Sequence, residues 1–101
     1  MPAYMISQVT VTDKEKFDQY IASTRSVAAK FNAKPLAIGM QPKVLNGDGD
    51  GHQMIFVIEF ESMEQLDKWH KSDDYHALVP LRDAGSNQRM MAYQAMPLSP
   101  S

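Results

Sequence analysis

The chain has 101 residues, no cysteine, and ten lysines and arginines against twelve aspartates and glutamates, which gives a formal charge of −2 at pH 7. This length accommodates one hydrophobic core, and the lack of cysteine excludes disulfides, thiolate nucleophiles and cysteine-based metal sites. The balanced charge provides no basic stripe to neutralise phosphates, so we expect no nucleic-acid partner.

The first eleven residues predict a strand rather than a targeting segment. Residues 3–11 (AYMISQVTV) are rich in β-branched and aromatic residues. The N-terminus has neither the charged start nor the continuous apolar core of a signal peptide. The longest fully apolar run, residues 54–58, is too short to span a bilayer. We therefore expect a cytoplasmic protein without a membrane partner.

A long amphipathic helix is predicted next. Thr12 and Glu15 form a capping-box signature, T-D-K-E, at its start. Asn32 is a plausible terminator, and Pro35 prevents the helix from continuing. Between these ends, apolar and small side chains recur at three- and four-residue spacing along one stripe of about five turns. The members of the stripe are Phe17, Tyr20, Ile21, Thr24, Val27, Ala28 and Phe31.

Two strands joined by a turn-rich loop follow. Residues 36–45 predict an edge strand, because Pro42 lacks a backbone donor and Gly39 favours a bulge. Residues 46–51 (NGDGDG) predict a turn. The alternating Asn and Asp suggest calcium, but the position where an EF-hand needs glutamate holds Val57, so we expect no metal there. Residues 53–60 (QMIFVIEF) predict a strand that is apolar on both faces.

The C-terminal part predicts a broken helix and a last strand. Ser62 and Gln65 form a second capping box, before an apolar face that includes Trp69. Ser72 or Asp73 restarts a short helix, which Pro80 makes irregular. The last strand is predicted over residues 89–96 (RMMAYQAM), and residues 97–101 are predicted to form a flexible tail.

The predicted order β-α-β-β-α-β is that of a ferredoxin-like α+β fold. In this fold a four-stranded antiparallel sheet carries its helices on one face. The third strand would expose apolar side chains on the other face unless something covers them. We therefore expect residues 1–96 to form a single domain that covers its open sheet face by homodimerisation.

Three segments carry a resemblance to a known family: the opening strand AYMISQVTVTD, the pair KVLNGD and MIFVIEFESMEQ, and WHKSDDYHALVPLRDAGSN. Over almost the whole chain, the sequence resembles the bacterial domain of unknown function numbered 1330, within the dimeric α+β barrel superfamily. In the third segment, the family pattern is matched by Trp69, Ser72, Tyr75 and Arg82. His70 replaces a second aromatic residue and Asp73 replaces a proline. The resemblance implies the fold and the dimer but no reaction; relatives in the superfamily include cofactor-free monooxygenases and haem-degrading enzymes.

The polar and aromatic residues of 69–82 are candidates for a small-molecule site in the cleft between sheet and helices. We predict His70 as an acid/base group and Arg82 as the group that orients an anionic oxygen. The predicted ligand contacts are Tyr4, Glu59, Trp69, Ser72, Tyr75 and His76. Some of these residues also have structural interpretations: Trp69 would pack in the core, Ser72 would cap a helix and Arg82 would pair with a carboxylate.

Three functions stay open. The first is a small-molecule-handling protein, including a cofactor-independent enzyme, for a hydrophobic or aromatic metabolite. The second is a non-catalytic accessory protein of a pigment- or antibiotic-type pathway, and the third is a dimeric structural module without a ligand. A methionine-lined cleft beside His70 would favour the first two. We expect no metal or other cofactor, because His70 and His76 lack the i, i+4 spacing of a helical zinc site; haem ligation by either histidine is the alternative.

Overall fold

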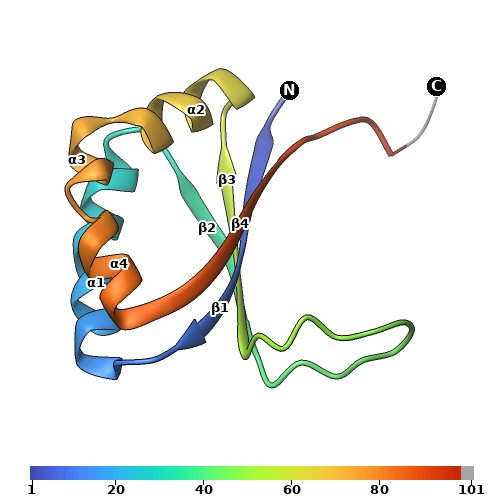
Figure 1. Ribbon diagram of the computed structural model, residues 1–101. Helices are drawn as coiled ribbons and strands as arrows, with labels where there is room; N and C mark the ends of the chain where they lie inside the picture. The colour runs from blue at the N-terminus through green and yellow to red at the C-terminus, as the bar shows by residue number, and fades with distance from the viewer. Residues whose placement is uncertain (99–101) are drawn as a thin grey trace.

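The computed structural model describes residues 1–98 and shows a four-stranded sheet with helices on one face (Figure 1). The sheet order is β2-β3-β1-β4, and every neighbouring pair is antiparallel. The predicted ferredoxin-like fold is therefore confirmed. Part of the predicted tail, residues 99–101, lies outside the described residues. The elements in chain order are β1 (Ala3–Val11), α1 (Lys14–Ala29), β2 (Lys34–Met40), β3 (Met54–Phe60), α2 (Met63–Lys71), α3 (Asp73–His76), α4 (Val79–Gly85) and β4 (Ser86–Gln94).

The start of α1 differs from the prediction. Asp13, not Thr12, is the N-cap, and its carboxylate accepts a hydrogen bond from the Lys16 amide at 3.2 Å. The amides of Thr12 and Asp13 both donate to the Gly85 carbonyl, at 3.0 and 3.1 Å, which holds them outside the helix. Since Asp and Thr are both good N-caps, this tertiary contact decides between them.

The end of α1 and its buried stripe agree with the sequence. Phe17, Tyr20 and Val27 of the stripe are buried against the sheet. Asn32 adopts φ +57°, the left-handed conformation that asparagine tolerates after a helix.

The second helical segment is divided by its caps. Ser62 caps α2 by accepting from the Gln65 amide at 3.1 Å, while the Gln65 side chain donates to the Phe31 carbonyl instead of returning to Ser62. Ser72 then ends α2 and caps α3. Pro80 lies in the first turn of α4, where its missing N–H leaves no helical bond unmade.

Two strand boundaries differ from the prediction. β2 covers Lys34–Met40 instead of 36–45, because Gln41 leaves the strand with φ +56°. The bulge falls between Pro35 and Ala37, not at Gly39, although the edge position is confirmed. β4 covers Ser86–Gln94 instead of 89–96, because it pairs with the full length of β1, from Val11 to Ala3.

The two faces of the sheet have different surroundings. The helices cover the face that carries Met5 and Val9 of β1, and no helix lies on the opposite face (Figure 1). The loop of residues 41–53 and the segment after β4 extend on that open side. The register places on the open face Tyr4, Ile6, Gln8 and Thr10 of β1, Ile55, Val57 and Glu59 of β3, and Arg89, Met91 and Tyr93 of β4. Across residues 1–98, none of the helices has the length and hydropathy needed to cross a membrane.

Candidate functional site

The structure separates the predicted site residues onto the two faces of the sheet. Trp69, Tyr75 and Arg82 lie on the helical side, where Tyr75 contacts both of the others. Tyr4 and Glu59 are cross-strand partners on the open face. The sheet therefore stands between this pair and the residues of the 69–82 segment.

Trp69 and Tyr75 are core residues, each only 1% exposed. The Trp69 ring packs against Tyr75 and Phe60, with centroid distances of 4.6 and 5.2 Å. Its indole Nε1 is nevertheless buried without a hydrogen-bond partner among the described residues. A buried N–H of this kind is costly unless an acceptor or a water reaches it.

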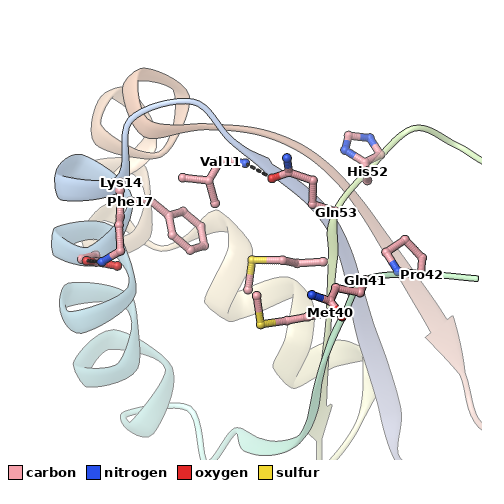
Figure 2. A pocket seen from close by; sticks show the side chains of 10 residues that line it. Val11, Lys14, Phe17, Met40, Gln41, Pro42, His52 and Gln53 are labelled. Atoms are coloured by element: carbon pink, nitrogen blue, oxygen red, sulfur yellow. Dashed lines mark hydrogen bonds and ion pairs between the residues drawn. The ribbon is translucent and has the colours of Figure 1, made fainter.

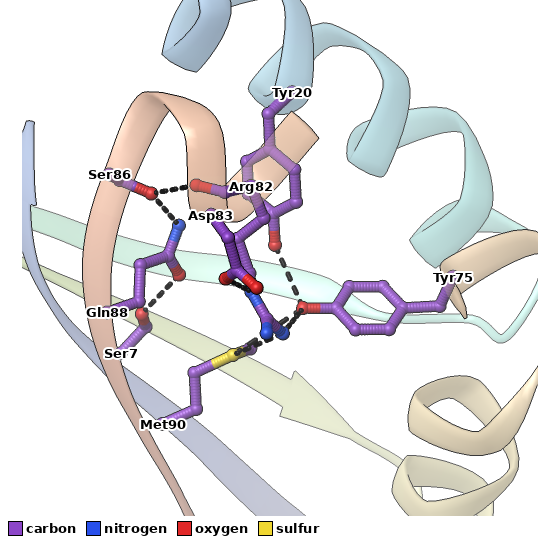
Figure 3. A network of polar contacts seen from close by, with 8 residues as sticks. All are labelled: Ser7, Tyr20, Tyr75, Arg82, Asp83, Ser86, Gln88 and Met90. Carbon is purple, nitrogen blue, oxygen red and sulfur yellow. Dashed lines mark hydrogen bonds and ion pairs between the residues drawn. The ribbon is translucent and has the colours of Figure 1, made fainter. Parts of the chain in front are cut away.

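The Tyr75 hydroxyl is the centre of a buried polar network (Figure 3). It lies 3.0 Å from the Tyr20 hydroxyl and accepts from Arg82 Nη1 at 3.1 Å. It also lies 3.5 Å from the sulfur of Met90. Burial raises the pKa of Tyr20, so this phenol stays protonated over the physiological range. The network links α1, α3, α4 and β4 in one place.

Arg82 is held in a fixed direction. Its Nε donates to Asp83 Oδ1 at 3.0 Å, and its side chain is 19% exposed. Burial opposes its charge, but hydrogen bonds with Tyr75 and Asp83 outweigh that cost and raise the pKa of Arg82. The guanidinium therefore stays cationic, as anion binding requires.

His70 borders this cluster from α2. Its ring lies 5.9 Å from Trp69 and 5.4 Å from Tyr75, centroid to centroid. Burial, and then the charge of Arg82, lower the pKa of His70, so the neutral imidazole predominates at pH 7. His76 is exposed at the end of α3, and the Ser72 hydroxyl is engaged in backbone hydrogen bonds.

A hollow of about 130 Å³ opens beside His70. We call this the His70 hollow. Three methionines line it. A methionine-lined cleft beside His70 is the feature that we expected of a ligand-handling protein. Its walls include Met5, Met90, Met91, Leu66 and Trp69.

A larger pocket of about 580 Å³ lies between α1 and the ends of β2 and β3 (Figure 2). We call it the α1–β3 pocket. Its apolar lining consists of Val11, Phe17, Met40, Pro42 and Met54. Its polar lining consists of Lys14, Asp18, Gln41, His52 and Gln53. The apolar lining comes from three strands or their ends and from the first turns of α1, so it exists only in the folded chain.

Hydrogen bonds fix the polar side of the α1–β3 pocket. The backbone N–H of Gln53 donates to the Val9 carbonyl at 2.9 Å, and the side-chain Oε1 of Gln53 accepts from the backbone N–H of Val11 at 3.4 Å. The Thr10 hydroxyl lies 3.0 Å from Nδ1 of His52. At the other side, Lys14 pairs with Asp18 at 2.8 Å, which raises the pKa of Lys14 and keeps it cationic. An amide and an ammonium group therefore border an apolar floor, whereas the ring of His52 is bonded to Thr10 on the open face of the sheet (Figure 2).

None of the residues that line the α1–β3 pocket was predicted from the sequence as a site residue. The only local signals were Phe17, at the first position of the helical stripe, and Met40, an apolar residue two positions before Pro42. Met40 is 68% exposed in the structure. The β2–β3 register brings Met40 opposite Met54. This pairing could not be read from either segment alone.

A metal site is not formed within residues 1–98: no three His, Asp or Glu side chains are grouped to hold an ion.

Comparison with known proteins identifies a family and a set of similar folds. Residues 2–96 match the family described as a domain of unknown function, DUF1330. No curated protein is significantly similar to the chain in sequence. A solved protein of unknown function from Rhodopseudomonas palustris is 21% identical, with a TM-score of 0.79 over 98% of this chain and 84% of that chain.

Two further solved structures share the fold at lower identity. SnoaB, a cofactor-independent oxygenase from Streptomyces nogalater, is 10% identical, with a TM-score of 0.68 over 99% of this chain and 98% of that chain. A dimeric ferredoxin-like protein of unknown function from Thermobifida fusca is 13% identical, with a TM-score of 0.64 over 94% and 92%. At these identities the likeness shows the fold alone.

Proposed function

Because this chain belongs to the DUF1330 family, whose description names no reaction, we propose its function from the site: the protein binds and handles a small hydrophobic molecule in the α1–β3 pocket. The proposal rests on a pocket of about 580 Å³ whose lining surface is mostly apolar. Ligand pockets typically measure roughly 300–1,000 Å³ and combine apolar walls with a few polar groups.

The lining favours a flat or aromatic ligand with a polar end. Phe17 offers a ring, and Met40 and Met54 offer thioethers, which make favourable contacts with aromatic rings. Lys14 and the amide of Gln41 lie at the polar side, where they can donate hydrogen bonds to a ligand oxygen. The ligand class is therefore a small hydrophobic or aromatic metabolite that bears at least one oxygen.

A more specific form of this proposal is that the protein converts the bound molecule without a cofactor. In this form of the proposal His52, the histidine of the pocket lining, would transfer the proton, and its hydrogen bond with Thr10 sets the orientation of its ring. SnoaB carries out cofactor-independent oxygenation on the same fold. A non-catalytic accessory protein would use the same pocket. The enzyme and the accessory protein differ only in whether the bound molecule is converted to a product.

We also propose that the protein is a homodimer joined through the open sheet face. Ile55, Met91 and Tyr93 on that face are 37%, 42% and 49% exposed, next to Ile6 and Val57. A second copy would remove this apolar surface from water. The similar protein from Thermobifida fusca is described as dimeric.

A pocket-filling variant tests the binding proposal. The probe is 1-aminoanthracene, a flat aromatic amine whose fluorescence increases in apolar surroundings. Met40→Trp should fill the pocket and weaken probe binding at least about tenfold, which is about 1.4 kcal/mol. The matched control is Met96→Trp, at another exposed methionine, which does not line the pocket. Equal affinities for the wild type and both variants would overturn the assignment.

A further inference from the structure

We propose a second ligand site, separate from the α1–β3 pocket: the His70 hollow binds a single-ring aromatic carboxylate, with its ring against Trp69 and its carboxylate hydrogen-bonded by Arg82 and Tyr75. The site does not depend on the function proposed above, because Met40, Met54 and Phe17 take no part in it.

The size and walls of the hollow fit one aromatic ring. Its volume is about 130 Å³, and an apolar protein cavity of roughly 150 Å³ is known to bind benzene. Besides Met90, the walls supply the Trp69 indole and the thioether of Met5. Thioethers and aromatic side chains both pack favourably against a ring.

Two strong donors lie directly behind the Met90 wall. The Met90 sulfur is 3.5 Å from the Tyr75 hydroxyl and 3.8 Å from Arg82 Nη1 (Figure 3). A thioether is a weak acceptor, whereas a carboxylate forms charge-assisted hydrogen bonds with a guanidinium. Because a methionine side chain is flexible, rotation of Met90 would let a ligand carboxylate take the place of its sulfur.

A third donor lies unused in the same region. The buried Nε1 of Trp69 has no partner within residues 1–98. Trp69, Met5 and Met90 also line a neighbouring cavity of about 40 Å³, which has Ser7 and Gln88 in its wall. That volume is enough for one water, which needs only about 10–15 Å³. A ligand oxygen or a bridging water there would satisfy the indole.

The charges around the hollow set the orientation of the ligand. Asp67 on α2 is exposed at the lining and disfavours an anion at the mouth. Arg82 lies behind Met90, with its Nη1 3.8 Å from the Met90 sulfur, and its carboxylate partner Asp83 is 63% exposed to solvent. Because the pKa of His70 is lowered, its imidazole is mainly neutral at pH 7 and contributes little to the electrostatic attraction of the carboxylate. The carboxylate is therefore directed inward, toward Arg82.

The sole tryptophan makes the site directly observable. Trp69 gives the only indole N–H signal of the chain, so a titration followed by ¹⁵N–¹H NMR reports on this site. The probe is benzoate, and the uncharged probe of matched size is benzamide. We expect benzoate to shift the indole signal in a saturable manner and to bind at least about tenfold more tightly than benzamide. An unmoved signal, or equal affinities for the two probes, would overturn the proposal.

Three variants separate the carboxylate contact from general stability. Arg82→Gln should weaken benzoate binding at least about tenfold while the affinity for benzamide stays unchanged, a difference that unfolding could not produce. Met90→Ala, which frees both donors and enlarges the hollow, should tighten benzoate binding several-fold. Met40→Leu in the α1–β3 pocket is the control and should leave it unchanged. If Arg82→Gln binds benzoate as the wild type does, or Met90→Ala does not bind it more tightly, the site is wrong.

Discussion

Ser72 is the residue at which one helix ends and the next begins. Its hydroxyl donates to the Trp69 carbonyl at 2.7 Å and accepts from the Tyr75 amide at 3.1 Å. These two bonds set the angle between α2 and α3, and so they hold the rings of Trp69 and Tyr75 4.6 Å apart. The structural interpretation of Ser72 is thus sufficient to explain its presence.

Removing this cap should lower stability. Ser72→Ala leaves the Tyr75 amide and the Trp69 carbonyl without their side-chain partner, and N-cap losses cost typically about 1 kcal/mol. We expect a decrease of that size in the free energy of unfolding, measured in urea. Ser23→Ala, on the exposed face of α1, is the control and should change the value little. A Ser72→Ala variant as stable as the control would contradict the capping role.

His70 should make the protein less stable in mild acid. Burial and the charge of Arg82 lower the folded-state pKa of His70 below its ordinary value of 6.5. The unfolded chain therefore binds the proton more readily, and stability is lost as the pH falls below about 6.5 toward the folded-state value. We expect the melting temperature to fall less between pH 7.5 and pH 5.5 in His70→Asn than in the wild type. The control is His76→Asn; a wild-type pH response in His70→Asn would refute this account.

At the scale of elements, the periodic and capped segments were predictable and the pockets were not. The α1 stripe, the two-faced β3 and the break at Ser72 are patterns that each lie within one continuous segment, and they were found in the sequence. The α1–β3 pocket brings Phe17, Met40 and His52 together only through the β2–β3 register and the loop between these strands. Within the 69–82 segment, Trp69, His70 and Arg82 lie around Tyr75, whereas Tyr4 and Glu59, which were assigned to the same site, occupy the other face of the sheet.

The contact between α1 and α3 should be measurable as a coupling energy. The hydroxyls of Tyr20 and Tyr75 lie 3.0 Å apart and are buried. In a double-mutant cycle of Tyr20→Phe and Tyr75→Phe, we expect a coupling of about 0.5–1.5 kcal/mol in the free energy of unfolding. Tyr75→Phe alone should cost more than Tyr20→Phe, because it also removes the acceptor of Arg82. Strictly additive effects would show that the two hydroxyls do not interact.

At the scale of the whole molecule, the sheet separates two surfaces of different character. The α1–β3 pocket lies on the helical side, and the His70 hollow lies at the β4 edge of the sheet, where both Met90 and Met91 line it. The open side presents apolar strands, with the 41–53 loop extending beyond them (Figure 1). On the open side, Gln8 donates to Asp50 and Thr10 contacts His52, so the base of this loop is fixed to β1. Because His52 also lines the α1–β3 pocket, the loop connects the two surfaces.

A charge in the middle of the open face should prevent dimerisation. Ile6 lies on the central strand β1, between Val57 of β3 and Met91 of β4. Ile6→Glu would place carboxylates at the interface of two copies, where burial of a charge is costly. We expect a monomer by analytical ultracentrifugation at micromolar concentration, while Ala22→Glu on the outer face of α1 stays dimeric. Wild-type protein that is already monomeric would contradict the proposed interface.

The most direct test of the central claim is native mass spectrometry of the protein purified from its own host, under conditions that preserve bound ligands. We expect a dimer that carries a defined small-molecule mass on each chain, and we expect Met40→Trp to lose this mass whereas Met96→Trp retains it. A bare wild-type dimer, or an adduct that Met40→Trp retains in full, would contradict ligand binding in the α1–β3 pocket and favour a dimeric module without a ligand there.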